Sequence, residues 1–312
     1  MEILFFGTSE FAIPTLKLLF DSNWKLAGVV TQPDRPRGRG RKISPPPVKS
    51  FLDGYGLPIF QVEKPQELFD LPAFQNIRPN VAVVVAYGKI LPPEILSFPP
   101  KGCVNLHPSL LPAYRGAAPI QRAIINGEKI TGVTTMYLSS EMDAGDIILQ
   151  EEVMIGDTTT YGELAELLAG KGAHLVLKTL TAVEQGAAPR RPQDHSRATY
   201  APPLQPGDEK IRWEKKAGEV DNLIRGMNPR PGAYTFFKGK ILKIWRAQVI
   251  NQDAEGFSPG QIVDIDPKLG FTVQTGESQL LLKEVQPAGR ARMSSADFLR
   301  GYRVQSGILL GE

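Results

Sequence analysis

An amide and an imidazole stand two positions apart in the segment Asn105-Leu-His-Pro-Ser-Leu-Leu-Pro112. This segment continues a short strand-like piece, so Asn105 and His107 are expected on one face at a strand end, because side chains alternate along a strand. An Asn side chain can polarise a carbonyl oxygen, and a His can move protons near neutral pH. The pair therefore predicts chemistry on one small carbonyl group.

A carboxylate that could serve this pair is Asp143, in the polar stretch Ser140-Glu-Met-Asp-Ala-Gly-Asp146. The composition of that stretch predicts a loop beside the sheet. An Asp close to an imidazole holds its tautomer and favours its protonated form. On the residues alone, a turn residue without a catalytic role explains Asp143 equally well.

Other enzyme chemistries find little support. Gly38-Arg-Gly40 lacks the third glycine of a dinucleotide fingerprint, and neither a P-loop nor a G-x-S-x-G elbow occurs. His174 and His195 are expected to be structural or solvated. Three scattered histidines and one cysteine do not suit a dedicated zinc cage, so we expect no metal. Cys103 is alone, which is typical of a small buried residue in a reducing cytoplasm.

The elements that must position these residues alternate between strands and helices. Apolar runs predict strands at Glu2–Phe6, Trp24–Thr31 and Asn80–Ala86, and Ser9 is a plausible N-cap for a helix reaching about Phe20. This alternation predicts an α/β fold with a doubly wound, mainly parallel sheet, in which ligands lie outside the carboxyl ends of the strands. Further predicted elements are helices at Val48–Tyr55, Pro65–Phe74 and Thr160–Gln185, strands at Leu57–Gln61, Thr131–Leu138 and Asp146–Val153, and a loop from Pro33 to Pro47.

The second half of the chain has a different organisation. Residues 186–207 contain five prolines and lose periodicity, which indicates a linker. A helix at Ala217–Met227 and a series of short strands then predict a small β-barrel. These strands are Ala233–Phe237, Lys240–Ile250, Gln261–Ile265, Gly270–Gln274 and Gln279–Val285. We therefore expect domains at residues 1–189 and 208–312, joined by a linker at 190–207.

Charge is unevenly distributed although the net charge is only +3. Residues 1–206 carry 20 basic and 20 acidic side chains, whereas residues 210–246 carry ten basic and three acidic ones. A second basic cluster in the first half consists of Arg35, Arg37, Arg39, Arg41 and Lys42. Both clusters could neutralise phosphates, and a solvated face plus a flexible loop is the alternative. Without a signal peptide or an apolar run of membrane length, we expect a cytoplasmic protein that does not enter membranes.

Asn105, His107 and Asp143 at this spacing resemble the catalytic set of the 10-formyltetrahydrofolate-dependent formyltransferases. Ser109-Leu-Leu-Pro112 is similar to the turn that contacts the folate in this family. The likeness covers essentially the whole chain, through Phe6-Gly-Thr8, Thr31-Gln-Pro-Asp-Arg-Pro36, Val84-Val-Ala-Tyr-Gly88, Tyr114-Arg-Gly-Ala-Ala-Pro-Ile-Gln121, Asn228-Pro-Arg-Pro-Gly232, Leu242-Lys-Ile-Trp-Arg-Ala247 and Gln286-Pro-Ala-Gly289. Ser9 stands where a Pro is common, and Pro108 where members acting on tRNA often have Gly, so the active-site motif alone does not choose the acceptor.

The resemblance implies a Rossmann-like domain followed by an oligonucleotide-binding-type (OB-like) barrel, and formyl transfer to methionine esterified to initiator tRNA. It implies 10-formyltetrahydrofolate as the co-substrate, no metal, and a monomer. The implied folate contacts are Ser109, Leu110, Leu111, Pro112, Tyr87, Gly88 and Ile90. The basic loop at residues 33–46 would touch the tRNA acceptor end, with Arg39 as the most important contact.

Two other functions remain open on the sequence. One is formyl transfer to a small acceptor, such as a purine precursor or an amino sugar nucleotide. The second domain and the basic loop argue against it, because a small substrate needs neither. The other is a non-enzymatic RNA-binding protein, against which the presence of Asn105, His107 and Asp143 argues.

Overall fold

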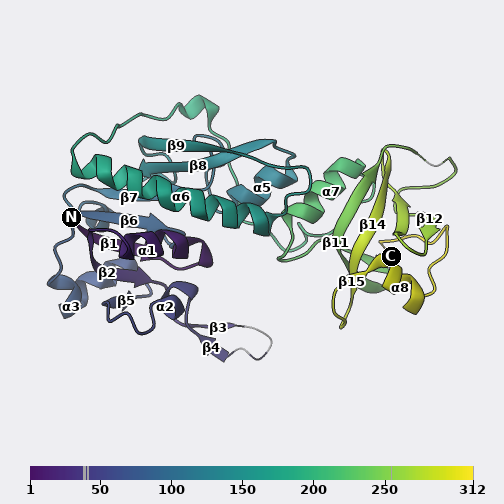
Figure 1. Ribbon diagram of the computed structural model, residues 1–312, viewed down its shortest axis with the longest axis horizontal. Helices are drawn as coiled ribbons and strands as arrows, with labels where there is room; N and C mark the ends of the chain where they lie inside the picture. Colours follow the sequence, from purple (N-terminus) through teal and green to yellow (C-terminus); the bar gives the residue numbers. More distant parts are fainter. Residues whose placement is uncertain (38–39, 41, 254, 312) are drawn as a thin grey trace. The chain divides into compact units, whose positions relative to one another are not determined.

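The structure is a computed structural model that describes residues 1–37, 40, 42–253 and 255–311 (Figure 1). The chain divides into two compact units, each built from separate stretches of sequence. The first comprises Met1–Pro119, Ile130–Met154 and Ala165–Ala201, and the second comprises Ile120–Lys129, Ile155–Leu164 and Pro202–Glu312. The segment expected to be a linker, residues 190–207, is therefore shared between the units, and the domain boundaries derived from the sequence stay a prediction.

Seven strands form the central sheet of the first unit, in the order β5-β2-β1-β6-β7-β8-β9. The first five are parallel, and β8 and β9 continue the sheet in antiparallel fashion. The predicted doubly wound, mainly parallel sheet is thus confirmed. Its strands are β1 (Glu2–Gly7), β2 (Lys25–Thr31), β5 (Ile59–Gln61), β6 (Val81–Val85), β7 (Cys103–His107), β8 (Ile130–Tyr137) and β9 (Ile147–Met154).

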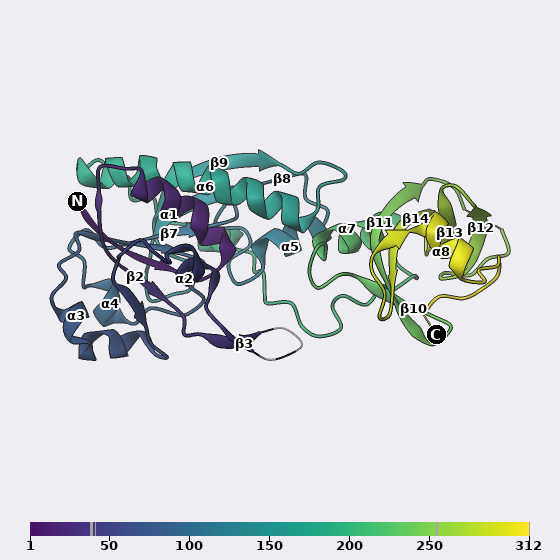
Figure 2. The same ribbon diagram turned by 60° about the horizontal axis from the view of Figure 1, so that its bottom comes forward.

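Helices cover both faces of this sheet, as Figures 1 and 2 show. On one face, η2 (Pro65–Asp70), α3 (Pro72–Gln75) and α4 (Pro93–Leu96) cover a core that includes Leu4 and Phe6 of β1 and Cys103 of β7. The opposite face is covered by α1 (Ile13–Phe20) and α6 (Tyr161–Glu184). Because every residue of β6 is buried, its apolar run without a polar face follows from burial on both sides.

The sequence prediction failed at several local points, among them the helix expected at Pro65–Phe74, which is divided into η2 and α3. The segment expected to be a loop holds a hairpin, because β3 (Arg35–Arg37) pairs antiparallel with β4 (Lys42–Ser44). Arg35, Pro36, Lys42 and Ile43 are exposed, so these strands show no alternation of buried apolar residues that a sequence pattern could detect. Ser9 precedes the first helical turn, η1 (Glu10–Ala12), but its side chain accepts no capping hydrogen bond. The helix expected at Val48–Tyr55 is the shorter α2 (Pro47–Phe51), which begins at Pro47, a residue that suits a first helical turn.

The second unit contains a six-stranded antiparallel sheet, and all five strands predicted here are confirmed. The strands are β10 (Tyr234–Phe237), β11 (Lys240–Ile250), β12 (Ile262–Asp266), β13 (Gly270–Gln274), β14 (Gln279–Pro287) and β15 (Met293–Ser294). They enclose a core with α7 (Ala217–Gly226) and with α8 (Ser295–Gly301), which the sequence did not predict. Because β10 and β12 end the strand order, closure into a barrel stays a prediction.

No helix in the described part of the chain has the length and apolar character needed to cross a lipid bilayer.

Candidate functional site

The carboxyl end of β7 carries the predicted amide and imidazole on one face. A Cβ placed on Gly172 of α6 would collide with Leu106, so Leu106 faces α6, and Asn105 and His107 face the other way. His107 is only 5% exposed, whereas Asn105 is half-buried. Among the described residues, nothing hydrogen-bonds to the Asn105 side-chain amide. This amide is therefore available to a ligand.

Both nitrogens of the His107 ring have a neighbour. Nε2 lies 2.9 Å from the carbonyl oxygen of Tyr114, and because a carbonyl oxygen only accepts, Nε2 must carry a proton. Nδ1 lies 3.7 Å from Oδ2 of Asp143, which is ion-pair distance but longer than a hydrogen bond. The main chain thus fixes the tautomer, and Nδ1 is the nitrogen left to exchange a proton beside a carboxylate.

Asp143 is held by the backbone of a distant loop. Its Oδ2 accepts a hydrogen bond of 2.8 Å from the N–H of Gly116, and its own φ of +50° lies in the left-handed region. Gly116 has a φ of +119°, and a Cβ there would lie 2.8 Å from the carbonyl oxygen of Ala201. A Cβ on Gly145 would lie 1.8 Å from the Tyr137 carbonyl oxygen. Both glycines allow the close backbone approach that places the carboxylate.

The turn after His107 is tied down by its own hydrogen bonds. Ser109 is buried, and its Oγ donates to the carbonyl oxygen of Ala113 over 2.6 Å. Leu111 is also buried, and its carbonyl oxygen accepts from the Gln150 side chain over 2.9 Å. Within the predicted folate-contacting turn, the half-buried Leu110 and Pro112 remain accessible to a ligand.

The other predicted folate contacts follow β6. The carbonyl oxygen of Tyr87 accepts from Thr8 Oγ1 at 2.9 Å and from Gln32 Nε2 at 2.8 Å, which joins the carboxyl ends of β1, β2 and β6. Burial raises the pKa of Tyr87 to about 12, so its phenol stays protonated at neutral pH. Gly88 takes a φ of +82°, and Ile90 leaves 73% of its surface exposed. An exposed isoleucine beside a catalytic edge suits an apolar ligand contact.

The predicted basic cluster is described only in part. Arg35 forms an exposed ion pair of 2.6 Å with Glu63, and Lys42 is exposed at the start of β4. Arg37 is the last residue of β3. Arg39 and Arg41 lie outside the described residues. The tRNA contacts assigned to this cluster therefore stay a prediction.

Three residues expected to play structural parts can be placed. Cys103 is buried, and burial raises the pKa of its thiol to about 12, so it is not a nucleophile at neutral pH. His174 bonds through Nδ1 to the Gly170 carbonyl oxygen within α6, and His195 is exposed. No set of three or more His, Cys, Asp or Glu residues with metal-binding geometry occurs in the described part of the chain.

Sequence reasoning missed two buried polar residues beside the site, Arg115 and Gln193. Arg115 precedes Gly116, and Gln193 lies in the proline-rich segment expected to be a linker. The Gln193 side chain donates to the carbonyl oxygens of Asp143 and Gly145. No local pattern marks such a residue, because its partners are 48 to 78 positions away in the sequence.

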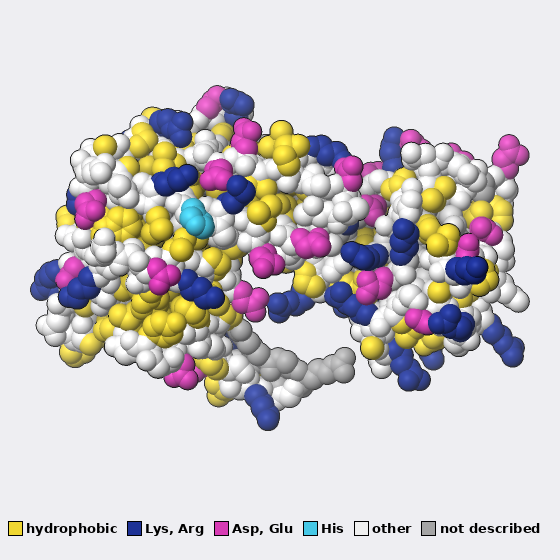
Figure 3. Space-filling view, viewed as in Figure 1, with side chains coloured by type: hydrophobic (Ala, Val, Ile, Leu, Met, Phe, Trp, Pro, Cys, Tyr) yellow, Lys and Arg dark blue, Asp and Glu magenta, His cyan; other side chains and the backbone are white. Residues whose placement is uncertain are grey.

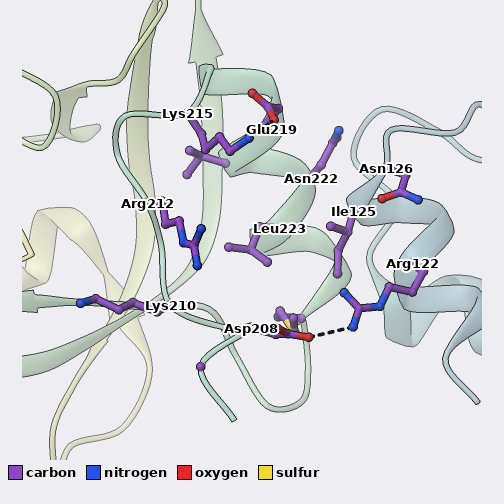
Figure 4. Close-up of a pocket in the computed structure, with 13 residues that line it drawn as sticks. Arg122, Ile125, Asn126, Asp208, Lys210, Arg212, Lys215, Glu219, Asn222 and Leu223 are labelled. Atoms are coloured by element: carbon purple, nitrogen blue, oxygen red, sulfur yellow. Dashed lines mark hydrogen bonds and ion pairs between the residues drawn. The ribbon is translucent and has the colours of Figure 1, made fainter. Parts of the chain in front are cut away.

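The second unit has a pocket of its own, with a volume of about 600 Å³. Its basic residues are Arg122, Lys210, Arg212 and Lys215 (Figure 4). Arg122 forms an ion pair with Asp208 over 2.8 Å, and Lys215 pairs with Glu219 over 3.1 Å. Within the described residues, Lys210 and Arg212 form no ion pair. Figure 3 shows several Lys and Arg side chains on the visible face of this unit.

Two protein-family models match the chain. The model described as "Formyl transferase" matches residues 1–180, and "Formyl transferase, C-terminal domain" matches residues 203–303. The methionyl-tRNA formyltransferase of Pelotomaculum thermopropionicum is 48% identical over 312 residues, covering 100% of this chain and 99% of that protein. The protein of the same name from Moorella thermoacetica is 48% identical over 311 residues, covering 100% of this chain and 99% of its own.

Among solved structures, the fold is similar to that of the N-formyltransferase from Helicobacter canadensis in complex with folinic acid and dTDP-3-aminofucose. The TM-score is 0.67 at 18% identity, and the match covers 90% of this chain and 98% of the other. At this identity the likeness concerns the fold.

Proposed function

Because this chain belongs to the methionyl-tRNA formyltransferases, we propose that it transfers the formyl group of 10-formyltetrahydrofolate to the α-amino group of methionine esterified to initiator tRNA. The observation that carries this proposal is the amide of Asn105, which has no hydrogen-bond partner among the described residues, on the same strand end as His107, whose ring lies beside Asp143. The product is N-formylmethionyl-tRNA, which serves translation initiation.

The reaction begins when the free amine attacks the formyl carbon and the carbonyl electrons move to oxygen. The Asn105 amide, together with His107 when protonated, donates hydrogen bonds to the resulting oxyanion. The bond between the formyl carbon and N10 then breaks. As this bond breaks, protonated His107 gives its Nδ1 proton to N10, so that tetrahydrofolate leaves neutral at that nitrogen, and the ring then takes up the proton that the attacking nitrogen loses.

Asp143 has a supporting part in this proposal. Its Oδ2 lies beside Nδ1 of His107 and is fixed by the Gly116 N–H, so the carboxylate stays in place while the ring gains and loses a proton. A negative charge at that distance stabilises the imidazolium form during transfer.

The folate site is assigned to two loops beside His107. We place the co-substrate against Leu110, Pro112 and Ile90, with the main chain at Tyr87 and Gly88 close to it. Ser109 and Leu111 are buried, and the proposal gives them the task of holding the turn. The folinic acid bound by the Helicobacter canadensis neighbour supports a folate ligand on this fold.

For tRNA, the proposal uses the basic residues of the second unit as well as the loop at residues 33–46. Lys210 and Arg212 are exposed and form no ion pair in the described part of the chain, so they can neutralise phosphates. Replacing both by glutamine is expected to weaken tRNA binding. The plot of log affinity against log salt should become shallower by about 1 for each phosphate that is no longer neutralised.

Titrating tRNA at several salt concentrations measures this slope. The control is the double variant Lys268→Gln/Lys283→Gln, which removes the same charge from exposed positions outside residues 210–246. Equal slopes for the two double variants would count against a phosphate site at Lys210 and Arg212.

The loop prediction is tested by Arg39→Ala, which is expected to impair productive use of charged tRNA and to leave folate binding intact. The defect is expected in turnover as well as in affinity, since Arg39 is proposed to act after docking. Arg78, an exposed arginine that donates to the carbonyl oxygens of Gln75 and Ile77, provides the matched control. Kinetics of Arg39→Ala equal to those of Arg78→Ala on charged initiator tRNA would refute the assignment.

The function as a whole is tested by one assay with three acceptors: charged initiator tRNA, an amino sugar nucleotide and an amine purine precursor. We expect formylation of the tRNA alone. Formylation of a small acceptor in its place would establish the alternative function, and binding of tRNA without formylation would indicate a non-enzymatic RNA-binding protein. The proposal also includes that the protein is a monomer and lies in the cytoplasm. Sedimentation measures the oligomeric state.

A further inference from the structure

Gln193 makes an unusual set of contacts for a residue outside any helix or strand. It is 6% exposed, and both ends of its side-chain amide are bonded. Nε2 donates to the carbonyl oxygen of Asp143 over 2.9 Å and to that of Gly145 over 2.8 Å. Oε1 accepts from Nη2 of Arg115 over 2.7 Å and from Nε over 3.2 Å. The amide therefore joins the Asp143 loop to Arg115.

Arg115 is itself a costly residue to bury. It is 3% exposed, and it has no carboxylate at ion-pair distance within the described residues. Its guanidinium bonds to Gln193 and lies 3.5 Å from Nδ1 of His195. Burying a guanidinium without a carboxylate opposes folding, so this arrangement is poorly explained by stability alone.

Three consecutive residues connect this network to the catalytic candidates. The carbonyl oxygen of Tyr114 fixes Nε2 of His107, Arg115 holds Gln193, and the N–H of Gly116 fixes the Asp143 carboxylate. Asp143 is consequently held at two points, by Gly116 through its side chain and by Gln193 through its main chain. Its left-handed φ of +50° requires such external support.

We propose that Gln193 is a positioning residue for formyl transfer, whose side-chain amide holds the Asp143 loop so that the carboxylate stays beside His107. The proposal rests on the function assigned above and adds a residue from a segment that the sequence indicates only as a linker. Gln193 acts through Asp143. Its removal therefore affects the chemical step more than it affects substrate binding.

The first test is Gln193→Met, which keeps the approximate length and removes the hydrogen bonds to Asp143, Gly145 and Arg115. We expect kcat to fall about 10-fold to about 100-fold, in line with misplacement of a catalytic group, while KM for folate and for tRNA changes less than about threefold. The matched control is Gln274→Met, since Gln274 is also 6% exposed and hydrogen-bonded but lies in β13 of the second unit. It should lose stability and keep its kcat.

A second variant at the same position is needed in case Gln193→Met does not fold. Gln193→Glu keeps an acceptor for Arg115 and gives the guanidinium a carboxylate, but it cannot donate to the carbonyl oxygens of Asp143 and Gly145. A folded Gln193→Glu protein with reduced kcat supports positioning of the loop. Full kcat in this variant would overturn the proposal, because neutralising Arg115 would then be all that Gln193 does.

The deciding measurement is a double-mutant cycle with Asp143→Asn. If Gln193 acts through the Asp143 carboxylate, adding Gln193→Met to Asp143→Asn should change kcat by less than about twofold. Equal fold-losses in the two backgrounds would overturn the proposal, because a purely structural role gives additive effects. The cycle is run with the acceptor that the parent enzyme formylates. If the parent enzyme formylates only a small amine, the tRNA assignment is refuted, but the cycle measured with that amine still tests the role of Gln193.

Discussion

Replacing His107 by alanine is expected to lower kcat by about two to four orders of magnitude, the range for a positioned acid–base group. The ring contributes a proton carrier at Nδ1 and a donor to the oxyanion, and alanine supplies neither. KM for charged tRNA should stay near that of the parent, since no phosphate contact is assigned to His107. Steady-state formylation of charged initiator tRNA measures both constants.

Folding has to be monitored in this experiment, because the Tyr114 carbonyl oxygen loses its partner when His107 is removed. His107→Gln serves as a second variant, since its amide can still donate to that oxygen but cannot carry a proton. His174→Ala is the matched control, because the hydrogen bond of His174 to Gly170 lies within its own helix. Turnover near that of the parent in folded His107→Gln would exclude proton transfer by His107.

Asn105→Ala is expected to lower kcat by about 100-fold to about 1000-fold, the loss typical of one oxyanion-hole donor. Thermal stability should hardly change, because the Asn105 amide bonds to no other described residue. Asn228 offers the contrast, since it is buried and its Nδ2 donates to the Trp245 carbonyl oxygen over 2.9 Å. Asn228→Ala should therefore lower the melting temperature and leave kcat unchanged.

Measuring kcat and the melting temperature on both variants separates a catalytic amide from a structural one. A lowered melting temperature with normal kcat for Asn105→Ala would show that the amide supports the fold, and would remove it from the oxyanion site.

The sequence predicts best those elements in which apolar residues or side-chain directions repeat at a regular spacing. Burial on both faces makes β6 a continuous apolar run, and alternation along β7 places Asn105 and His107 together. Asp143 is singled out by a family likeness, and the structure brings its carboxylate within 3.7 Å of the imidazole.

Two kinds of feature escape prediction, namely a local strand pairing that buries no apolar pattern and contacts between residues distant in the sequence. The β3–β4 hairpin pairs through the backbone, and Arg35, Pro36, Lys42 and Ile43 are exposed, so no alternation of buried apolar residues signals it in the sequence. In the sequence, Gln193 cannot be told from other polar residues of a proline-rich segment, because its proposed role depends on hydrogen bonds to Asp143 and Arg115. Neither hydropathy nor propensity carries information about such partners.

The second unit draws residues 120–129 and 155–164 from the middle of the chain. A Cβ on Gly226 of α7 would lie 2.6 Å from the Ile125 side chain, and the carbonyl oxygen of Asn228 accepts from the N–H of Gly162. These contacts make the unit a poor module for transplantation. A fragment that begins at residue 202 would lack residues 120–129 and 155–164, and with them Ile125, against which Gly226 of α7 packs. Protein engineers who want to move this unit to another enzyme would have to carry three pieces of chain together.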